Sequence, residues 1–176
     1  MSRRLIALVM AAASLTSAGA QTWRDALPQA SASRMIGEGE YRWFGLHIYT
    51  AQLWAAQATA TLDTPLALQI TYARSLSGQR LVDTSIAEIR RMNGSAVPDE
   101  TAARWRAALS QVLPDVHAGD RLTGVYLPAE GARFYANDRA TGQIQDPALA
   151  RAFFAIWLDP ATRAPALRQH LLGLSP

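Results

Sequence analysis

The sequence predicts an α+β fold in which a layer of helices covers one face of a large antiparallel sheet. Segments with the two-residue period of strands and segments with the 3.6-residue period of helices occur in groups, in the order strands, two helices, strands, two helices. Parallel α/β folds instead alternate single strands with single helices. The 176 residues include no cysteine, so packing rather than disulfide bonds must stabilise the chain, which is long enough to bury a core.

The first twenty residues contain the three parts of a secretory signal peptide in order. Arg3 and Arg4 form a positively charged start, residues 5–15 are apolar, and Ala18-Gly19-Ala20 is a small-x-small cleavage site. We expect residues 1–20 to be removed after Ala20 and the protein to act in the periplasm. The apolar run is too short to span a bilayer, which takes about 20 apolar residues, and no other segment is apolar enough to do so.

The positive charge of the whole chain comes mainly from its first residues. The net charge is +3, with 17 basic residues against 14 acidic ones, and every basic residue is an arginine. Removal of Arg3 and Arg4 with the signal peptide leaves 15 basic against 14 acidic residues. A nearly neutral exported chain is not expected to bind nucleic acid.

Residues 21–32 are polar and rich in Ala and Ser, which predicts a flexible lead before one domain over residues 33–176. A buried strand is predicted over residues 34–53, where Gly37 and Gly39 permit a bulge or twist. Its aromatic and aliphatic residues are Trp43, Phe44, Leu46, Ile48 and Tyr49. A second strand is predicted over residues 66–74, where apolar and polar residues alternate.

Helical spacing of apolar residues then predicts two helices. The first covers the segment from Leu81 to Asn93-Gly94, and the second begins at Pro98 and ends before Pro114. Later strands are predicted over residues 121–127, 133–136 and 143–145, with a reversal made by residues 137–138 and 142. Two final helices are predicted, one after the cap Asp146-Pro147 and one from about Pro165 to Gly173.

Four stretches of the chain are informative through their order and spacing. They are residues 43–49 (WFGLHIY) with 51–54 (AQLW), residues 70–79 (ITYARSLSGQ), residues 119–123 (GDRLT), and residues 153–158 (FFAIWL) with 167–168 (LR) and 171–173 (LLG). In this order and spacing they resemble the chalcone isomerase-like family, in its bacterial exported branch. The resemblance covers roughly residues 33–173. It implies an open-faced β-sandwich, a large antiparallel sheet covered by a layer of helices, with a cleft between the two layers.

The resemblance implies three branches of function. Plant enzymes of the family close chalcones into flavanones, related proteins bind fatty acids without catalysis, and the bacterial exported members look non-catalytic, some of them binding haem. The plant enzymes use an arginine, a threonine, a tyrosine and an asparagine. The positions that match them here are Arg34, Phe44, Leu81 and Glu88. Because Phe44 and Leu81 cannot bind a water or donate to a ketone, chalcone isomerase activity is not expected.

The sequence therefore favours a non-catalytic periplasmic protein that binds an apolar small molecule, a fatty acid or a similar acid. In this interpretation Arg34 pairs with the carboxylate of the ligand and Tyr72 adds a hydroxyl donor, while Phe44, Leu81 and Glu88 complete the site. The competing interpretation is structural: Phe44 and Leu81 fill a closed core, and Arg34 is a surface residue.

Three further functions stay open at this point. His47, in a strand near Trp43 and Tyr49, is the best candidate for an axial haem ligand. An enzyme of another kind could transfer protons with Glu88 and Arg34. A role based on protein interaction is also compatible with the sequence, which does not predict an oligomeric state. No pair of histidines has the spacing of metal ligands, so no structural zinc site is expected.

Overall fold

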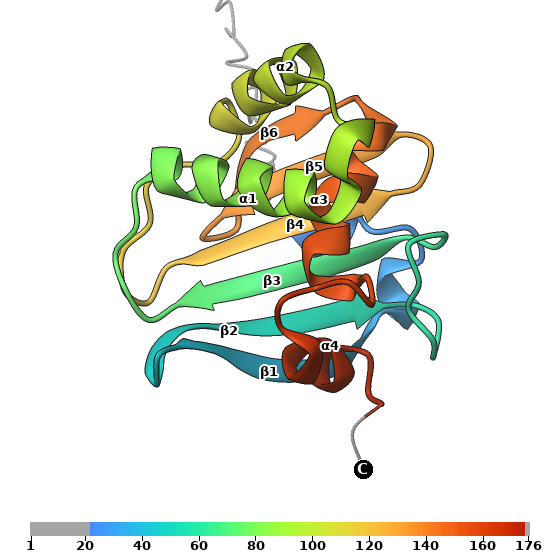
Figure 1. Cartoon of the computed structure of the whole chain (residues 1–176). Coiled ribbons are helices and arrows are strands. Elements are labelled where there is room, and N and C mark those ends of the chain that lie inside the picture. Colours follow the sequence, from blue (N-terminus) through green and yellow to red (C-terminus); the bar gives the residue numbers. More distant parts are fainter. Residues whose placement is uncertain (1–21, 175–176) are drawn as a thin grey trace, which may run out of the picture.

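The sheet is a six-stranded antiparallel meander in which each strand pairs with its neighbour in sequence (Figure 1). The computed structural model describes residues 22–174. The strands are β1 (Arg34–Trp43), β2 (Leu46–Ala55), β3 (Leu66–Tyr72), β4 (Arg121–Leu127), β5 (Gly131–Ala136) and β6 (Arg139–Ile144). The signal peptide and cleavage site expected over residues 1–20 lie outside the described residues.

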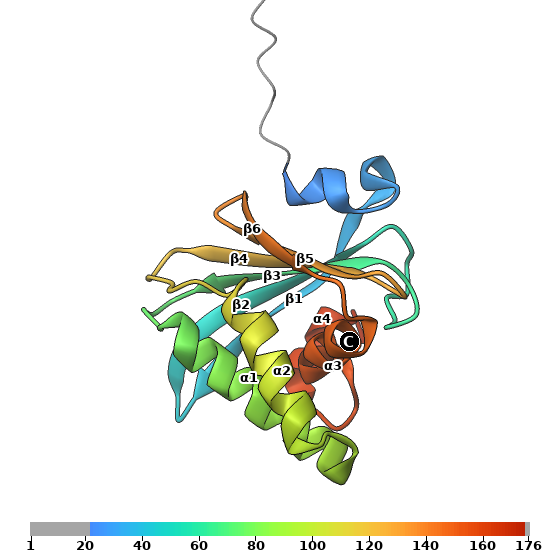
Figure 2. The ribbon, with the colours of Figure 1, turned by 90° about the horizontal axis from the view of Figure 1, so that it is seen from above.

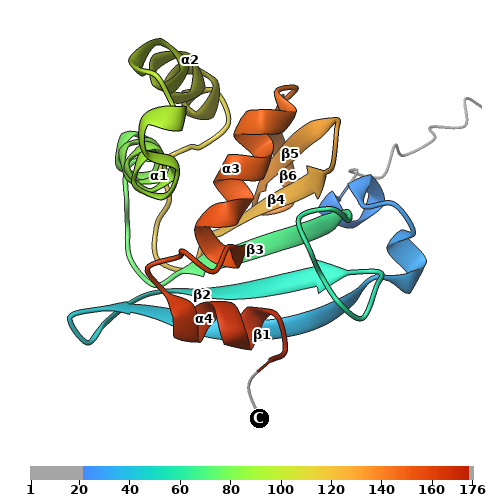
Figure 3. The same cartoon turned by 45° about the vertical axis from the view of Figure 1, so that its right-hand side comes forward.

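The four α-helices cover one face of this sheet (Figure 2). They are α1 (Gly78–Asn93), α2 (Asp99–Ser110), α3 (Pro147–Leu158) and α4 (Pro165–Leu171). Their starts are fixed locally: Ser77 caps α1 by accepting a hydrogen bond from the Arg80 amide, and Asp146 caps α3 by accepting from two amides. Helix α2 packs on α1, whereas α3 and α4 pack on the sheet (Figure 3). The predicted α+β, open-faced architecture is confirmed.

The main core lies between the sheet and the helices. Its fully buried members come from both layers and include Leu53 and Leu66 of the sheet and Ile89, Leu149 and Phe154 of the helices. Burial of a side chain of this size stabilises the fold by roughly 1.5–3 kcal/mol. This core holds the helix layer against the sheet along most of its length.

A second, smaller core lies on the opposite face of the sheet. The short helix η1 (Trp23–Ala26), followed by η2 (Ala30–Ala32), places Trp23 and Leu27 against the outer face of the sheet, where both are almost fully buried. The flexible lead expected over residues 21–32 is therefore not observed over residues 22–32. Two large apolar side chains among polar neighbours anchor this segment, and neither takes part in a periodic pattern that a sequence analysis would detect.

The single strand predicted over residues 34–53 is wrong, because the chain reverses at Phe44 and Gly45. Both residues have positive φ angles, of 47° and 79°, and Trp43 pairs directly with Leu46. Phe44 lies at the tip of this hairpin and is 94% exposed rather than buried. Strand-forming residues continue through the tip, so Gly45 is the only turn signal between residues 40 and 50.

Glycines elsewhere set two local features. A bulge between Met35 and Gly37 confirms the irregularity predicted near the start of β1. Gly37 also lets helix α4 approach β1, since a Cβ atom there would overlap the backbone oxygen of His170. In contrast, the β5–β6 reversal consists of residues 137–138 alone, and Gly142, predicted to be part of it, lies within β6.

Candidate ligand-binding cavity

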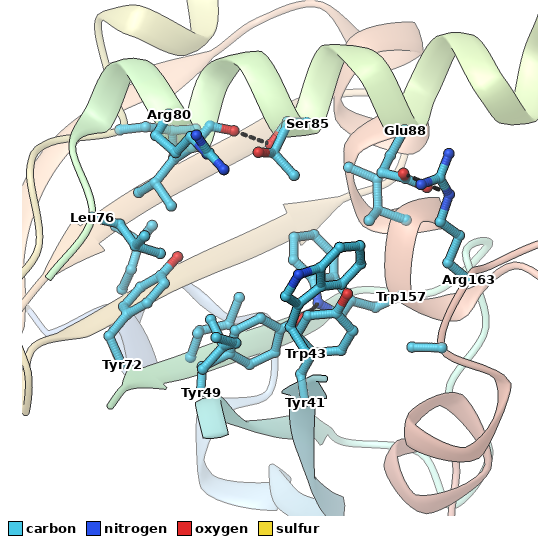
Figure 4. A pocket seen from close by; sticks show the side chains of 18 of the residues that line it. Tyr41, Trp43, Tyr49, Tyr72, Leu76, Arg80, Ser85, Glu88, Trp157 and Arg163 are labelled. Atoms are coloured by element: carbon cyan, nitrogen blue, oxygen red, sulfur yellow. Dashed lines mark hydrogen bonds and ion pairs between the residues drawn. The ribbon is translucent and has the colours of Figure 1, made fainter. Parts of the chain in front are cut away.

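A cavity of about 400 Å³ lies between the first three strands of the sheet and helix α1 (Figure 4). Helix α3 and the segment that joins it to α4 form its remaining wall. Most of its lining is apolar or aromatic, and the volume lies in the range of small-molecule sites, roughly 300–1,000 Å³. The helix layer and the sheet therefore enclose a space that a small apolar molecule can occupy.

Three tyrosines on adjacent strands form the floor of the cavity. Tyr41 of β1 is opposite Tyr49 of β2, which is opposite Tyr72 of β3. The rings of Tyr41 and Tyr49 stack with their centroids 5.1 Å apart, and the ring of Tyr72 meets that of Tyr49 edge-on at 6.1 Å. This ladder gives the sheet a continuous aromatic surface beneath helix α1.

A bulge in β2 brings a fourth side chain into this floor. The register shifts between Tyr41 and Arg42, so Ile48 has no partner on β1, and both Ile48 and Tyr49 line the cavity. His47 then points to the other face of the sheet, where its ring shares a hydrogen bond of 3.2 Å with Thr50. His47 is not among the residues that line the cavity, so the arrangement does not offer it as an axial ligand for a haem bound there.

Helix α1 forms the roof. Leu81, Ser85 and Glu88 repeat at the spacing of one helix face, with Arg80 and Thr84 beside them, and all five line the cavity. The Ser85 hydroxyl donates to the backbone oxygen of Leu81, so its polarity is satisfied within the helix. The roof is thus mixed, with Leu81, Thr84 and Ser85 between a charged residue at each end.

Helix α3 closes the cavity with Phe153, Ile156 and Trp157. The Trp157 indole donates a hydrogen bond of 2.9 Å to the Tyr49 hydroxyl, which ties the wall to the floor. Burial raises the pKa of Tyr49 and of Tyr72 far above the usual tyrosine range, since the interior penalises a phenolate. Both phenols are therefore neutral hydrogen-bonding groups at physiological pH.

Charged residues lie at the two ends of the cavity. At one end Glu88 accepts from Arg91 at 2.9 Å and from Arg163 at 3.0 Å. Burial raises the pKa of the nearby Tyr41, and the negative charge of Glu88 raises it further. At the other end Arg80 lines the cavity from the start of α1, above Tyr72 (Figure 4), and it forms no ion pair with any carboxylate of residues 22–174.

The structure brings together three of the five residues predicted for the site. Tyr72, Leu81 and Glu88 line the cavity, whereas Arg34 and Phe44 do not. Arg34 begins β1, about 30 Å along the strand from Trp43, and Phe44 is at the exposed hairpin tip. Consequently Arg34 cannot hold a ligand in this cavity or share a reaction in it with Glu88. The basic residues that line the cavity are Arg80 and Arg163, and Arg163 is paired with Glu88.

Several residues that line the cavity were not predicted from the sequence, chiefly Tyr41, Tyr49, Arg80, Trp157 and Arg163. The two tyrosines are opposite each other only because of the bulge, which leaves no trace in the residue pattern. Arg80 did carry a signal, because it follows the cap Ser77 by three residues and neighbours Leu81 on the helix. Arg163 lies in the α3–α4 connection, where no periodicity guides a prediction.

Two further findings concern the described residues. Over residues 22–174, no helix combines the length and apolar character needed to cross a bilayer. The same span holds no cluster of three or more His, Cys, Asp or Glu residues placed to bind a metal ion.

Comparisons with known proteins agree with this architecture. A chalcone isomerase-like family model matches residues 35–173. An uncharacterized protein of Haemophilus influenzae is 30% identical over 139 residues, which cover 78% of this chain and 67% of that protein. The crystal structure of a fatty-acid binding protein of Arabidopsis thaliana superposes with a TM-score of 0.60 at 11% identity, covering 80% of this chain and 87% of that one. The chain belongs to the chalcone isomerase-like family.

Proposed function

We propose that this protein is a non-catalytic periplasmic binding protein for an apolar small molecule that carries an acid group, a fatty acid or a similar acid. The observation that carries the proposal is the cavity, whose apolar and aromatic surface ends at the guanidinium group of Arg80, which has no carboxylate partner within residues 22–174. Among the described residues around the cavity, Glu88 is the one carboxylate beside Arg80, Arg91 and Arg163. This excess of positive charge favours an anionic ligand.

The ligand is oriented by this asymmetry. Its hydrocarbon part lies over the tyrosine ladder and against Trp157, where it removes apolar surface from water. Its acid group lies beside Arg80, which offers a charge-assisted hydrogen bond, and the neutral Tyr72 hydroxyl can donate a second one. The same type of ligand is named for the Arabidopsis protein that shares this fold.

The absence of catalysis rests on two positions. Where the plant enzymes of the family are expected to use a tyrosine, Leu81 lines the cavity, and where they use a threonine, Phe44 lies outside it. Glu88 faces the cavity, but it is engaged by two guanidinium groups. Neither Leu81 nor Phe44 can bind a water molecule or a ketone oxygen, so the polar set required for the cyclisation is incomplete.

Thermal shift measurements with a panel of saturated fatty acids test the proposal. A ligand present at 100 times its Kd stabilises a protein by about 2.7 kcal/mol, which raises the Tm of a domain of this size by roughly 5–10 °C. Alcohols of the same chain lengths serve as matched controls and are expected to give a smaller shift. Native mass spectrometry of protein purified from the periplasm should show a bound acid. Unchanged Tm values with every acid, together with no co-purified ligand, contradict the proposal.

A further inference from the structure

An exposed apolar cluster lies at the tip of the β1–β2 hairpin. Trp43 is 52% exposed, Phe44 94% and Leu46 45%, and the rings of Trp43 and Phe44 meet edge-on with centroids 5.0 Å apart. We call these three residues the apolar tip. The other exposed large apolar residues of the described chain, Met35 and Leu174, lie near the opposite end of β1.

The backbone at the tip does not favour the residue that occupies it. Phe44 and Gly45 form a two-residue hairpin turn with both φ angles positive, a geometry in which Asn-Gly is strongly preferred. An aromatic residue with φ near +47° is an outlier that costs conformational energy. Because Phe44 is almost fully exposed, its edge-on contact with Trp43 leaves most of its ring available to something outside the molecule.

The apolar tip is continuous with the cavity. Trp43 lines the cavity, and Leu46 is its direct cross-strand partner on the same face of the hairpin. The hairpin projects beyond helix α1 (Figure 3), so the tip extends the apolar floor outward from the cavity. A ligand that leaves the cavity past Trp43 would meet whatever the tip is in contact with.

The charges beside the tip are mainly positive. Arg42 is paired with Glu40 at 2.7 Å, whereas Arg74 donates to the backbone oxygen of His47 and forms no ion pair with a carboxylate of residues 22–174. Arg80, at the near end of the cavity, is likewise unpaired within that span. Aromatic side chains flanked by arginine are typical of groups that enter the headgroup region of an anionic bilayer.

We propose that the apolar tip inserts into the headgroup region of an anionic lipid bilayer and holds the open end of the cavity against the membrane. A specific protein interface needs about 1,000 Å² of complementary surface, which three side chains at a hairpin tip do not supply. A fluid bilayer needs no matching shape. The inference takes from the proposed function only that the cavity holds a lipid-like molecule.

The test is co-sedimentation of the purified protein with vesicles of phosphatidylethanolamine and phosphatidylglycerol, compared with vesicles of phosphatidylcholine alone. The variant is Phe44→Asn, because asparagine suits the turn and should preserve or raise the Tm. Loss of one inserted aromatic ring predicts binding to the anionic vesicles at least about tenfold weaker. Phe44→Trp should bind like the wild type. Met35→Ser removes another exposed apolar residue, away from the tip, and should bind like the wild type as well.

Each outcome bears on the inference. Wild-type protein that sediments with neither type of vesicle, or Phe44→Asn and Met35→Ser binding alike, overturns it. Binding of a fatty acid without vesicles is measured in parallel, and Phe44→Asn should leave it unchanged because Phe44 does not line the cavity. A protein that binds vesicles but no fatty acid refutes the proposed function alone, and the reverse result refutes only the membrane contact.

Discussion

Replacement of Arg80 by glutamine tests how the cavity selects an acid. Arg80 lines the end of the cavity at which Tyr72 also lies, and its guanidinium group has no carboxylate partner among the described residues. A hydrogen bond to a charged group contributes about 1.5–3 kcal/mol, and Arg80 is exposed, so water reduces this toward the lower limit. We therefore expect Arg80→Gln to raise the Kd of a fatty acid roughly 10- to 30-fold.

Isothermal titration of a fatty acid and of the alcohol with the same chain length separates charge from burial. The alcohol should bind Arg80→Gln about as well as it binds the wild type, because the apolar contacts remain. Arg104→Gln, on the exposed surface of α2, is the matched control and should change neither Kd. Equal weakening of acid and alcohol, or no weakening of either, would refute the assignment of Arg80 to the acid group.

Three other predictions concern the scaffold of the cavity. Tyr49→Phe leaves the Trp157 indole without its acceptor and should lower the Tm by about 2–6 °C, whereas an unchanged Tm means that the bond contributes nothing. Burial raises the pKa of Tyr49 and Tyr72, so the folded state retains protons that the unfolded chain loses above about pH 10. The urea concentration at the unfolding midpoint should therefore fall as the pH rises past that value. It should fall less steeply in Tyr72→Phe than in the wild type. A urea midpoint that does not change from about pH 9 to about pH 11 would contradict this pH dependence. Gly37→Ala should separate α4 from β1, because its Cβ overlaps the His170 oxygen, and hydrogen exchange in α4 should accelerate while exchange in α2 is unchanged.

The helices were predictable because their signals are local. Asp146 and Pro147 mark the start of α3, and Asn93-Gly94 marks the end of α1, so a short window of sequence contains both the period and its limits. The hairpin was not predictable in the same way. Residues with strand propensity continue through Phe44, and only the paired register of the two strands reveals the reversal.

The site depended still more on tertiary structure. Leu81 and Glu88 were assigned through the family resemblance and Tyr72 as a hydroxyl donor, and all three line the cavity. The basic group was assigned to Arg34 because it is the nearest match to the arginine of the plant enzymes, but the length of β1 carries it away from the cavity. Arg80, in the first turn of α1 after the cap Ser77, lines the cavity at one end.

The polar pattern of the floor arises from a single inserted residue. Without the bulge at Ile48, Tyr41 would be opposite Ile48, and the tyrosine ladder would be interrupted. A bulge moves the side chain of every residue between it and the turn to the opposite face of the sheet. The bulge at Ile48 therefore also places His47 on the outer face. Sequence alone does not reveal such an insertion, because both registers have the same composition.

The central claim is that an apolar acid binds in the cavity between the tyrosine ladder and α1, and a variant that fills this cavity tests it most directly. Ser85 is buried and faces the cavity from the middle of α1 (Figure 4), so Ser85→Phe places a ring in the space that the ligand would occupy. By calorimetry the wild-type protein should bind about one equivalent of a fatty acid, and Ser85→Phe should bind none while it unfolds at an equal or higher Tm. Binding of the acid to Ser85→Phe with the wild-type Kd would contradict the account.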